Sequence, residues 1–216
     1  MLPAILLGLG AYVLGSVPTG LLIGRARGVD IRAIGSGNIG ATNVARALGT
    51  PWAILVLVLD ALKGFLPVFV ARQCGLGLPP LAVAVVGLLA IVGHMFTVFL
   101  RGHGGKGVAT SLGVAFGLSP LLALGALAVY GAAYALTRLS SVGSLLGIWS
   151  FPLLATVAGG AAGGVAREYV GLSIVTAGLV TFRHRDNLRR LWRGQERPAR
   201  PARPARKDTT HDGARR

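Results

Sequence analysis

The chain has 216 residues, of which 53% are hydrophobic and 13% charged, and its mean hydropathy is +0.66. This composition is too apolar for an ordinary soluble domain. The net charge of +15 could indicate a nucleic-acid-binding protein, but twelve of the twenty-two Lys and Arg residues lie in the segment 183–216. A basic segment of this kind is more typical of an anchor on anionic lipid, so nucleic acid is not expected as a partner.

Apolar segments that suit a lipid bilayer recur along most of the chain. They cover residues 2–24, 52–71, 81–100, 107–118, 121–136, 142–162 and 169–182. The first lacks the basic start of a cleaved signal peptide, so it is expected to stay as a helix. The fourth, with about twelve residues, could extend only about 18 Å and needs shielding by other helices. The sequence therefore predicts an all-α integral membrane protein with seven transmembrane helices, the fourth of them short.

Basic residues between these segments gather on alternate connections. One side of the membrane would hold Arg25, Arg27, Arg32, Arg46, Arg101, Lys106, Arg138 and the basic end of the chain, and the other side only Arg72 and Arg167. The positive-inside rule then places the amino terminus outside and the carboxyl terminus in the cytoplasm, with the protein in the cell (plasma or inner) membrane. Residues 1–196 form one transmembrane domain, and residues 197–216, with Arg-Pro-Ala repeats, are expected to be a disordered basic tail.

The first polar cluster occupies residues 35–46, between the first two apolar segments. It contains a G-x-G-x-x-G pattern, but no strand precedes it and Asp60 falls inside an apolar segment, which excludes a dinucleotide-binding fold. Glycines still allow backbone N–H groups to converge on an anion, and the neighbouring side chains add hydroxyl, amide and guanidinium donors. The alternative is a flexible polar connector. The candidate phosphate ligands are Ser36, Gly37, Asn38, Thr42, Asn43 and Arg46.

A second cluster comprises residues 93–96 and 104–110, and its second part combines a double glycine, Lys106 and a helix start. It is not a Walker A loop, because Gly107 stands where the Ser or Thr that binds Mg²⁺ would be. A lysine beside a helix amino terminus favours a bound anion, so Lys106 is a candidate phosphate ligand, the alternative being a basic anchor of the membrane segment. His94 and His103 are more typical of capping or packing and are left out of the predicted site.

A third cluster follows the last apolar segment. His184 and Asn187 would share one helix face at the same membrane depth as the other two clusters, whereas Arg185, Arg189 and Arg190 are more typical of a juxtamembrane helix on anionic lipid. Asp60 and Lys63 lie inside the second segment, where charges must pair or face a polar cavity. They could form a structural ion pair or position a substrate.

These residues together resemble a known family, the bacterial membrane-integral glycerol-3-phosphate acyltransferases that use acyl phosphate as donor. The resemblance rests on GSGNIGATNVARALG at 35–49, LDALKG at 59–64, GHMF with GGKGVAT, and HRDN with GQE. It implies transfer of a fatty acyl group to the sn-1 hydroxyl of glycerol 3-phosphate at a cytoplasmic active site, without cofactor or metal. The products would be 1-acyl-glycerol 3-phosphate and phosphate, in the first acylation step of phospholipid synthesis.

The resemblance also implies a role for individual residues. It assigns phosphate and substrate binding to Ser36, Asn38, Thr42, Asn43, Arg46, Lys63 and Lys106, and it places His184 and Asn187 nearest the chemistry. Thr97 and Gly102 depart from the usual family pattern. A transporter of an organophosphate is the main alternative function and a lipid phosphatase the second, although the chain shows no matching halves of a transporter. The oligomeric state and the acyl-chain preference stay open.

Overall fold

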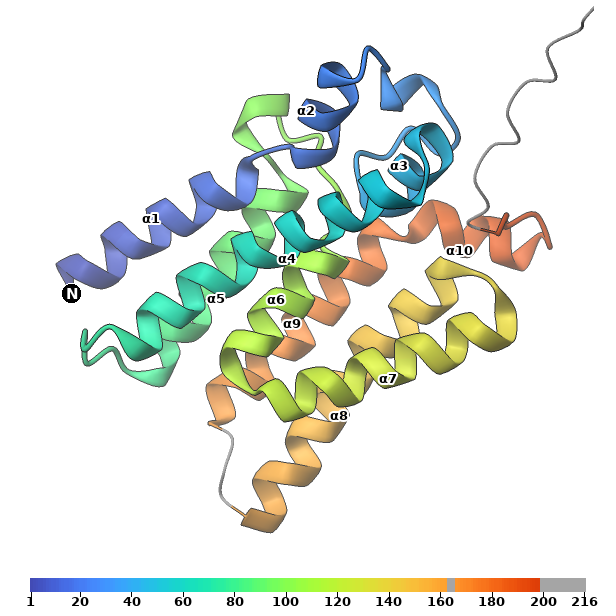
Figure 1. The fold of residues 1–216 in the computed structure, drawn as a ribbon. Helices are drawn as coiled ribbons and strands as arrows, with labels where there is room; N and C mark the ends of the chain where they lie inside the picture. The colour runs from blue at the N-terminus through green and yellow to red at the C-terminus, as the bar shows by residue number, and fades with distance from the viewer. Residues whose placement is uncertain (163–165, 199–216) are drawn as a thin grey trace, which may run out of the picture.

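The computed structural model describes residues 1–162 and 166–198, with the side chains of 158–162 excepted, and this part of the chain is helical without strands (Figure 1). The predicted all-α class is thus confirmed. The α-helices are α1 (Leu2–Ser16), α2 (Thr19–Ala26), α3 (Ala41–Leu48), α4 (Thr50–Gln73), α5 (Pro80–Met95), α6 (Val108–Leu118), α7 (Pro120–Thr137), α8 (Ser140–Ala162), α9 (Arg167–Arg183) and α10 (Arg185–Trp192). Two 3₁₀ helices, η1 (Ile31–Ala33) and η2 (Val98–Leu100), lie in the connections.

Five helical stretches in the described part are long and apolar enough to cross a membrane: Leu2–Ala26, Thr50–Gln73, Pro80–Leu100, Pro120–Thr137 and Ser140–Val157. The expected short fourth segment is the apolar helix α6, whose 11 residues extend about 16 Å at 1.5 Å per residue. Helix α9 has 17 residues and is not among the five. The multi-pass membrane character is therefore supported, and the seven crossings stay a prediction.

The first predicted segment is not one continuous helix, because it breaks between α1 and α2 at Val17 and Pro18. Proline has no N–H to donate and disfavours helical geometry at the residue before it. At the break the carbonyl of Val17 accepts a hydrogen bond from the N–H of Thr19 at 3.0 Å, and the ammonium group of Lys63 donates to it at 2.9 Å. The sequence pattern alone did not predict this contact between Lys63 and the helix break.

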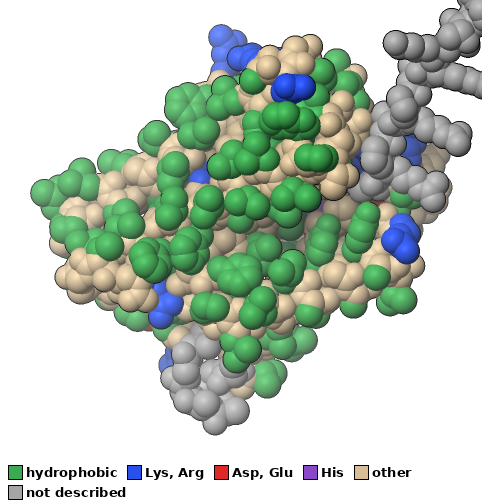
Figure 2. All heavy atoms as spheres, in the orientation of Figure 1, with side chains coloured by type: hydrophobic (Ala, Val, Ile, Leu, Met, Phe, Trp, Pro, Cys, Tyr) green, Lys and Arg blue, Asp and Glu red, His purple; other side chains and the backbone are tan. Residues whose placement is uncertain are grey.

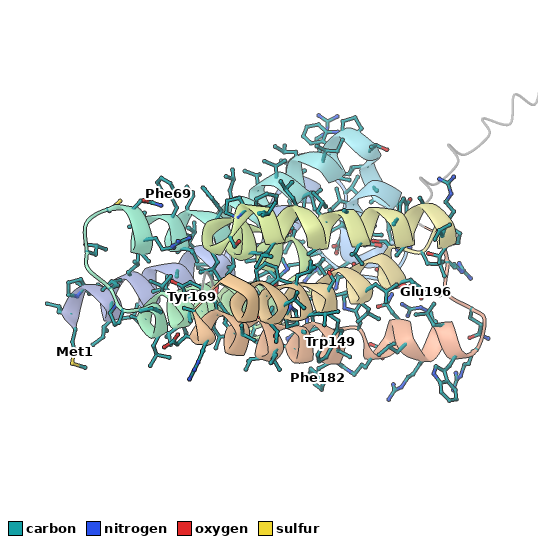
Figure 3. All side chains as sticks on the ribbon, turned by 90° about the horizontal axis from the view of Figure 1, so that it is seen from below. Met1, Phe69, Trp149, Tyr169, Phe182 and Glu196 are labelled. Atoms are coloured by element: carbon teal, nitrogen blue, oxygen red, sulfur yellow. The ribbon has the colours of Figure 1, made fainter. Side chains whose placement is uncertain are left out.

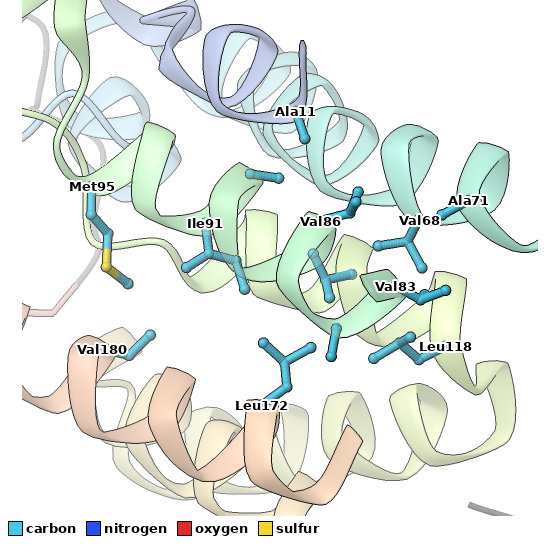
Figure 4. Packing of buried hydrophobic residues seen from close by; sticks show 13 residues of the cluster. Ala11, Val68, Ala71, Val83, Val86, Ile91, Met95, Leu118, Leu172 and Val180 are labelled. Carbon is cyan, nitrogen blue, oxygen red and sulfur yellow. The ribbon is translucent and has the colours of Figure 1, made fainter. Parts of the chain in front are cut away.

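Helices pack in close pairs, α1 on α5, α4 on α6 and α7 on α8. Small residues permit the close approach of α4 and α6. A Cβ atom on Gly64 would lie 2.1 Å from the Thr110 carbonyl oxygen, and one on Gly113 would lie 1.8 Å from that of Ala61. Such contacts are typical of membrane helices, where packing rather than water drives association. The largest buried apolar cluster lies between α4, α5, α6 and α9 (Figure 4).

Many large hydrophobic side chains are spread over the face of the molecule shown in Figure 2. Leu62 and Phe69 of α4 and Leu153 of α8 are exposed, at 40%, 44% and 66%. A soluble monomer rarely exposes apolar side chains on this scale, whereas lipid tails would cover them. Helices α3 and α10 and the 101–107 connection lie together at one end of the bundle, called here the polar end. Residues 199–216, most of the predicted tail, lie outside the described residues.

Candidate functional site

One cavity of about 840 Å³ opens at the polar end and continues between the helices. Its walls include every predicted site residue except Gly37 and Lys63: Ser36, Asn38, Thr42, Asn43, Arg46, Lys106, His184 and Asn187. Apolar side chains of α6, α7, α8 and α9 line the rest, among them Leu118, Leu127, Phe151 and Leu172. Tyr169 and Glu196, both in its wall, lie far apart along the bundle (Figure 3). The cavity therefore joins a polar entrance to an apolar channel.

The first loop, residues 35–46, is held by its own asparagines. The Asn43 Oδ1 atom accepts hydrogen bonds from the backbone N–H of Ser36 at 3.0 Å and from its hydroxyl at 3.3 Å. The Asn43 Nδ2 group donates to the carbonyl of Ile31 at 2.7 Å, and Asn38 Oδ1 accepts from the Gly40 N–H at 2.8 Å. The two amides that the sequence suggested as ligands thus shape the loop, and Ser36, Thr42 and Arg46 bring donor groups to the cavity wall.

The second loop, residues 104–107, is held by its neighbours instead. The N–H groups of Gly104 and Gly105 donate to carbonyls of Met95 and His94 at 3.1 and 3.0 Å. The Arg183 guanidinium donates to the carbonyls of the same two glycines at 2.6 and 3.1 Å. A Cβ atom on Gly105 would lie 2.1 Å from His94 Nε2, so only glycine fits there. These contacts place Lys106 at the start of α6 and in the cavity wall.

Lys106 begins a chain of polar contacts across the entrance. Its ammonium donates to Asn187 Oδ1. Asn187 Nδ2 donates to Glu196 Oε1 at 2.5 Å, and Glu196 also accepts from the hydroxyl of Ser141 at 2.9 Å and from Arg190 Nε at 2.7 Å. Glu196 and Arg190 line the cavity and were missed as site residues. Glu196 stands in the GQE segment that carries the family resemblance, but its contact with Ser141 depends on how the chain folds and could not be predicted from that segment.

The electrostatics of the entrance favour anions. Burial lowers the pKa of Lys106 to about 8, which leaves it mostly charged at neutral pH. Burial also lowers the pKa of Arg46 from its ordinary value, but a guanidinium keeps its charge. Burial would raise the pKa of Glu196, but hydrogen bonds from Asn187, Arg190 and Ser141 outweigh it and lower this pKa.

His184 is buried at the junction of α9 and α10. Burial, with a smaller contribution from the charge of Lys106, lowers the pKa of His184 to about 4, so its imidazole is neutral at neutral pH. Its Nδ1 atom lies 2.8 Å from the carbonyl oxygen of Val180. Because a carbonyl only accepts hydrogen bonds, Nδ1 carries the proton, and Nε2 is left as an acceptor.

Asp60 and Lys63 form a buried ion pair at 2.8 Å, as one of the two sequence interpretations expected. Lys63 does not line the cavity, and its substrate-binding role stays a prediction. Asp60 does line it and accepts a hydrogen bond from Thr19. His94, which sequence reasoning set aside, also lines the cavity and lies 3.8 Å from Asp60.

Thr97 and Gly102, the two departures from the family pattern, fit the structure locally. The Thr97 hydroxyl donates to the carbonyl of Ser16 at 2.5 Å and accepts from the Phe99 N–H at 3.2 Å. Gly102 has φ of +82°, a left-handed conformation that favours glycine.

Comparison with known proteins gives a consistent result. The family model of glycerol-3-phosphate acyltransferase matches residues 5–194. The chain belongs to this family. A glycerol-3-phosphate acyltransferase of Geobacter sulfurreducens is 50% identical over 91% of this chain and 97% of the relative, and one of Rubrobacter xylanophilus is 45% identical over 91% and 95%.

A solved structure has the same fold. The crystal structure of PlsY (YgiH), an integral membrane glycerol 3-phosphate acyltransferase, in its glycerol 3-phosphate form, matches with a TM-score of 0.85 and 40% identity. The match covers 91% of this chain and 95% of that one, and the lysophosphatidic acid form of the same protein gives a TM-score of 0.83. The family expected from the sequence is confirmed, and the transporter alternative is not favoured.

Proposed function

We propose that this glycerol-3-phosphate acyltransferase uses acyl phosphate as its donor and acylates the sn-1 hydroxyl of glycerol 3-phosphate. The observation that carries the proposal is the single cavity, which connects two cation-bearing loops to an apolar channel. Both reactants carry a phosphate, so each loop has an anion to bind. The acyl chain fits the channel between α6, α7, α8 and α9. An acyl-CoA donor would need a nucleotide pocket and an acyl carrier protein a docking surface, and the connections at the polar end are short.

The reaction needs little beyond positioning, because acyl phosphate is a mixed anhydride with a good leaving group. The glycerol hydroxyl oxygen forms a bond with the acyl carbonyl carbon, the bond from that carbon to the phosphate oxygen breaks, and phosphate leaves with the bonding electron pair. The hydroxyl proton passes to His184 Nε2 or to a phosphate oxygen. With a pKa of about 4, His184 is a weak base, so the phosphate is the better final acceptor of the proton.

Substrate binding rearranges the entrance in this proposal. Lys106 and Asn187 contact each other in the free protein, and Asn187 also donates to Glu196. An incoming phosphate competes for the Lys106 ammonium, because it carries more negative charge than an amide oxygen. This exchange frees Asn187 Oδ1 to accept a hydrogen bond from a hydroxyl group of glycerol 3-phosphate. Ser36, Thr42 and Arg46 then bind the second phosphate from the opposite wall.

The proposal includes a topology of seven crossings, with α6 and α9 completing the bundle, the amino terminus outside and the polar end in the cytoplasm of the plasma or inner membrane. The basic residues of the polar end support this orientation through the positive-inside rule. Cysteine replacements at positions 184 and 187 should be labelled only from the cytoplasmic side. Labelling from outside would overturn the proposed orientation but would not affect the proposed reaction, which is tested separately below.

The chemical test uses purified protein with palmitoyl phosphate and measures phosphate release with and without glycerol 3-phosphate. We expect release only with the acceptor, no turnover with palmitoyl-CoA, and loss of activity in Asn187→Ala and His184→Ala. Release without the acceptor would indicate a phosphatase. Robust turnover of the CoA thioester would refute the proposed donor, while movement of glycerol 3-phosphate across vesicles without acylation would favour the transporter.

A further inference from the structure

Two buried hydroxyl groups in the cavity wall have no hydrogen-bond partner among the described residues. They belong to Ser111 of α6 and Thr176 of α9, whose side chains are 5% and 2% exposed. Other hydroxyls of the wall are bonded within their own helices, Ser144 to the carbonyl of Ser140 at 2.7 Å and Ser173 to that of Val170 at 2.6 Å. Buried polar groups are rarely left unpaired, so a ligand is the natural partner for Ser111 and Thr176.

The packing of α5 indicates that Ser111 and Thr176 lie at a similar depth on α6 and α9. A Cβ atom on Gly87 of α5 would lie 2.8 Å from a methyl group of Val114 and 3.5 Å from one of Leu172, so these two residues share one level. Ser111 is one turn nearer the polar end than Val114 along α6, and Thr176 is one turn nearer than Leu172 along α9. The register of α5 against α9 can be followed in Figure 4, where Met95 and Val180 lie toward one end and Leu172 farther along.

This level is where the polar entrance meets the apolar channel. Ser111 lies three residues after Val108, the first residue of α6, about 4.5 Å along the helix from the loop that holds Lys106, and helical side chains lean back toward the helix start. Leu118 and Leu172 line the cavity farther from the polar end. A donor with its phosphate at Lys106 and its chain among these leucines would place its carbonyl group between them.

We propose that Ser111 and Thr176 donate hydrogen bonds to the carbonyl oxygen of the acyl donor. The proposal deepens, and rests on, the use of acyl phosphate proposed above. As the glycerol oxygen bonds to the carbonyl carbon, negative charge develops on the carbonyl oxygen; the electron pair of that oxygen then re-forms the C=O double bond as the bond to phosphate breaks and phosphate leaves with the charge. Two hydroxyl donors held in place by α6 and α9 stabilise the charged oxygen more than they stabilise the neutral carbonyl. They are catalytic residues in addition to those predicted from the sequence.

The chain offers a matched control for this proposal. Thr110, the residue before Ser111, is 0% exposed and its hydroxyl also lacks a partner in the described part of the structure. It faces α4, where its carbonyl lies beside Gly64, and it does not line the cavity. If the loss of a buried, unpaired hydroxyl lowered kcat only by disturbing the structure, removal of the Thr110 hydroxyl would lower kcat as well. If the hydroxyl acts by contacting the acyl donor, kcat should fall only at Ser111 and Thr176.

The experiment compares Ser111→Ala, Thr176→Val and Thr110→Val in detergent, with palmitoyl phosphate and glycerol 3-phosphate varied separately. Ser111→Ala and Thr176→Val should each lower kcat at least about tenfold, because the hydrogen bonds are strongest in the transition state. The KM for glycerol 3-phosphate should change less than about twofold, and Thr110→Val should keep the wild-type kcat. Thr176→Ser restores the hydroxyl with less volume and should recover most of the activity.

Three outcomes would overturn the proposal, and a fourth would refute the proposed donor instead. Wild-type kcat in both Ser111→Ala and Thr176→Val would overturn the proposal, and so would equal losses in Thr110→Val. Loss of activity in Thr176→Ser together with full activity in Thr176→Val would show that the side-chain volume at position 176 matters and its hydroxyl does not. This result would also overturn the proposal. Failure of the wild-type protein to use palmitoyl phosphate would instead refute the proposed donor, so the two failures are distinguishable.

Discussion

The two glycine-rich loops, each proposed above to bind a phosphate, are held in different ways. The first loop is fixed from within, because Asn43 bonds Ser36 and Ile31, residues 7 and 12 positions away. The second is fixed from outside, because Arg183, 78 and 79 positions away, holds the carbonyls of Gly105 and Gly104. The contacts that hold the first loop are therefore close in sequence. Those that hold the second come from Arg183 at the end of α9 and from the carbonyls of His94 and Met95 in α5.

The strongest test of this difference is the removal of the Asn43 side chain. Asn43→Ala would leave the Ile31 carbonyl and the Ser36 N–H without their partners, and each buried unpaired group costs about 1–3 kcal/mol. We expect a loss of about 2–4 kcal/mol in the free energy of unfolding, against about 1 kcal/mol for Asn38→Ala, which frees only the Gly40 N–H. The free energy of unfolding of both variants can be measured in lipid or detergent. Equal losses would mean that Asn43 does not organise the loop.

The next test removes one cation from each loop. Lys106→Ala and Arg46→Ala should each lower kcat/KM at least tenfold, which corresponds to about 1.4 kcal/mol or more of lost transition-state stabilisation. The reason is that each side chain meets a phosphate in the proposed complex. Steady-state kinetics with both substrates varied measures these changes. Near wild-type activity in both variants would refute the assignment of the two loops as phosphate-binding sites.

The cations should also differ in their response to pH. With a pKa of about 8, Lys106 loses its positive charge as the pH rises above 8, whereas Arg46 stays charged throughout this range. The kcat/KM for glycerol 3-phosphate should therefore be level below pH 7 and about tenfold lower at pH 9. Lys106→Arg, if active, should remove this decline. A decline that persists in that variant would have to be assigned to another group.

The external support of the second loop predicts a smaller effect. Arg183→Lys keeps the charge but cannot reach two carbonyls with a planar fork, so the loop should lose part of its order. We expect the KM for glycerol 3-phosphate to rise about fivefold, roughly 1 kcal/mol, with a smaller change in kcat. Arg185→Lys is the matched control, because Arg185 is exposed and, among the described residues, its guanidinium meets the carbonyl and the ring of Phe182. A similar rise in both variants would contradict a specific support by Arg183.

The sequence predicted those parts of the molecule whose information is local. Helical segments follow from apolar runs, and Ser36, Thr42 and Arg46 stand in one short motif that the structure places in the cavity wall. The ion pair of Asp60 and Lys63 followed from the cost of burying either charge alone.

What the sequence did not predict depends on distant segments meeting. The contact of Lys63 with the Val17 carbonyl, at the helix break next to Pro18, depends on the packing of α4 against α1 and α2 and cannot be predicted from the local sequence. Glu196 acquires its partners only because α10 returns the chain to Ser141, 55 residues earlier. The unpaired hydroxyls of Ser111 and Thr176 cannot be recognised in any sequence, since being unpaired is a property of the packed helices.

The smallest effect is expected at the end of the chain, where the first loop meets the start of the predicted tail. Arg46 donates to the carbonyl of Arg197 at 3.4 Å, and Glu196 holds Asn187, so the contacts of the site extend to these two residues. Truncation after Arg197 should therefore leave kcat unchanged in detergent, since Arg-Pro-Ala repeats cannot bury a core. Truncation after Gly194 is the matched control: it removes Glu196 and should abolish activity. A large loss in the longer variant, with folding preserved, would mean that the tail acts on the first loop through Arg46.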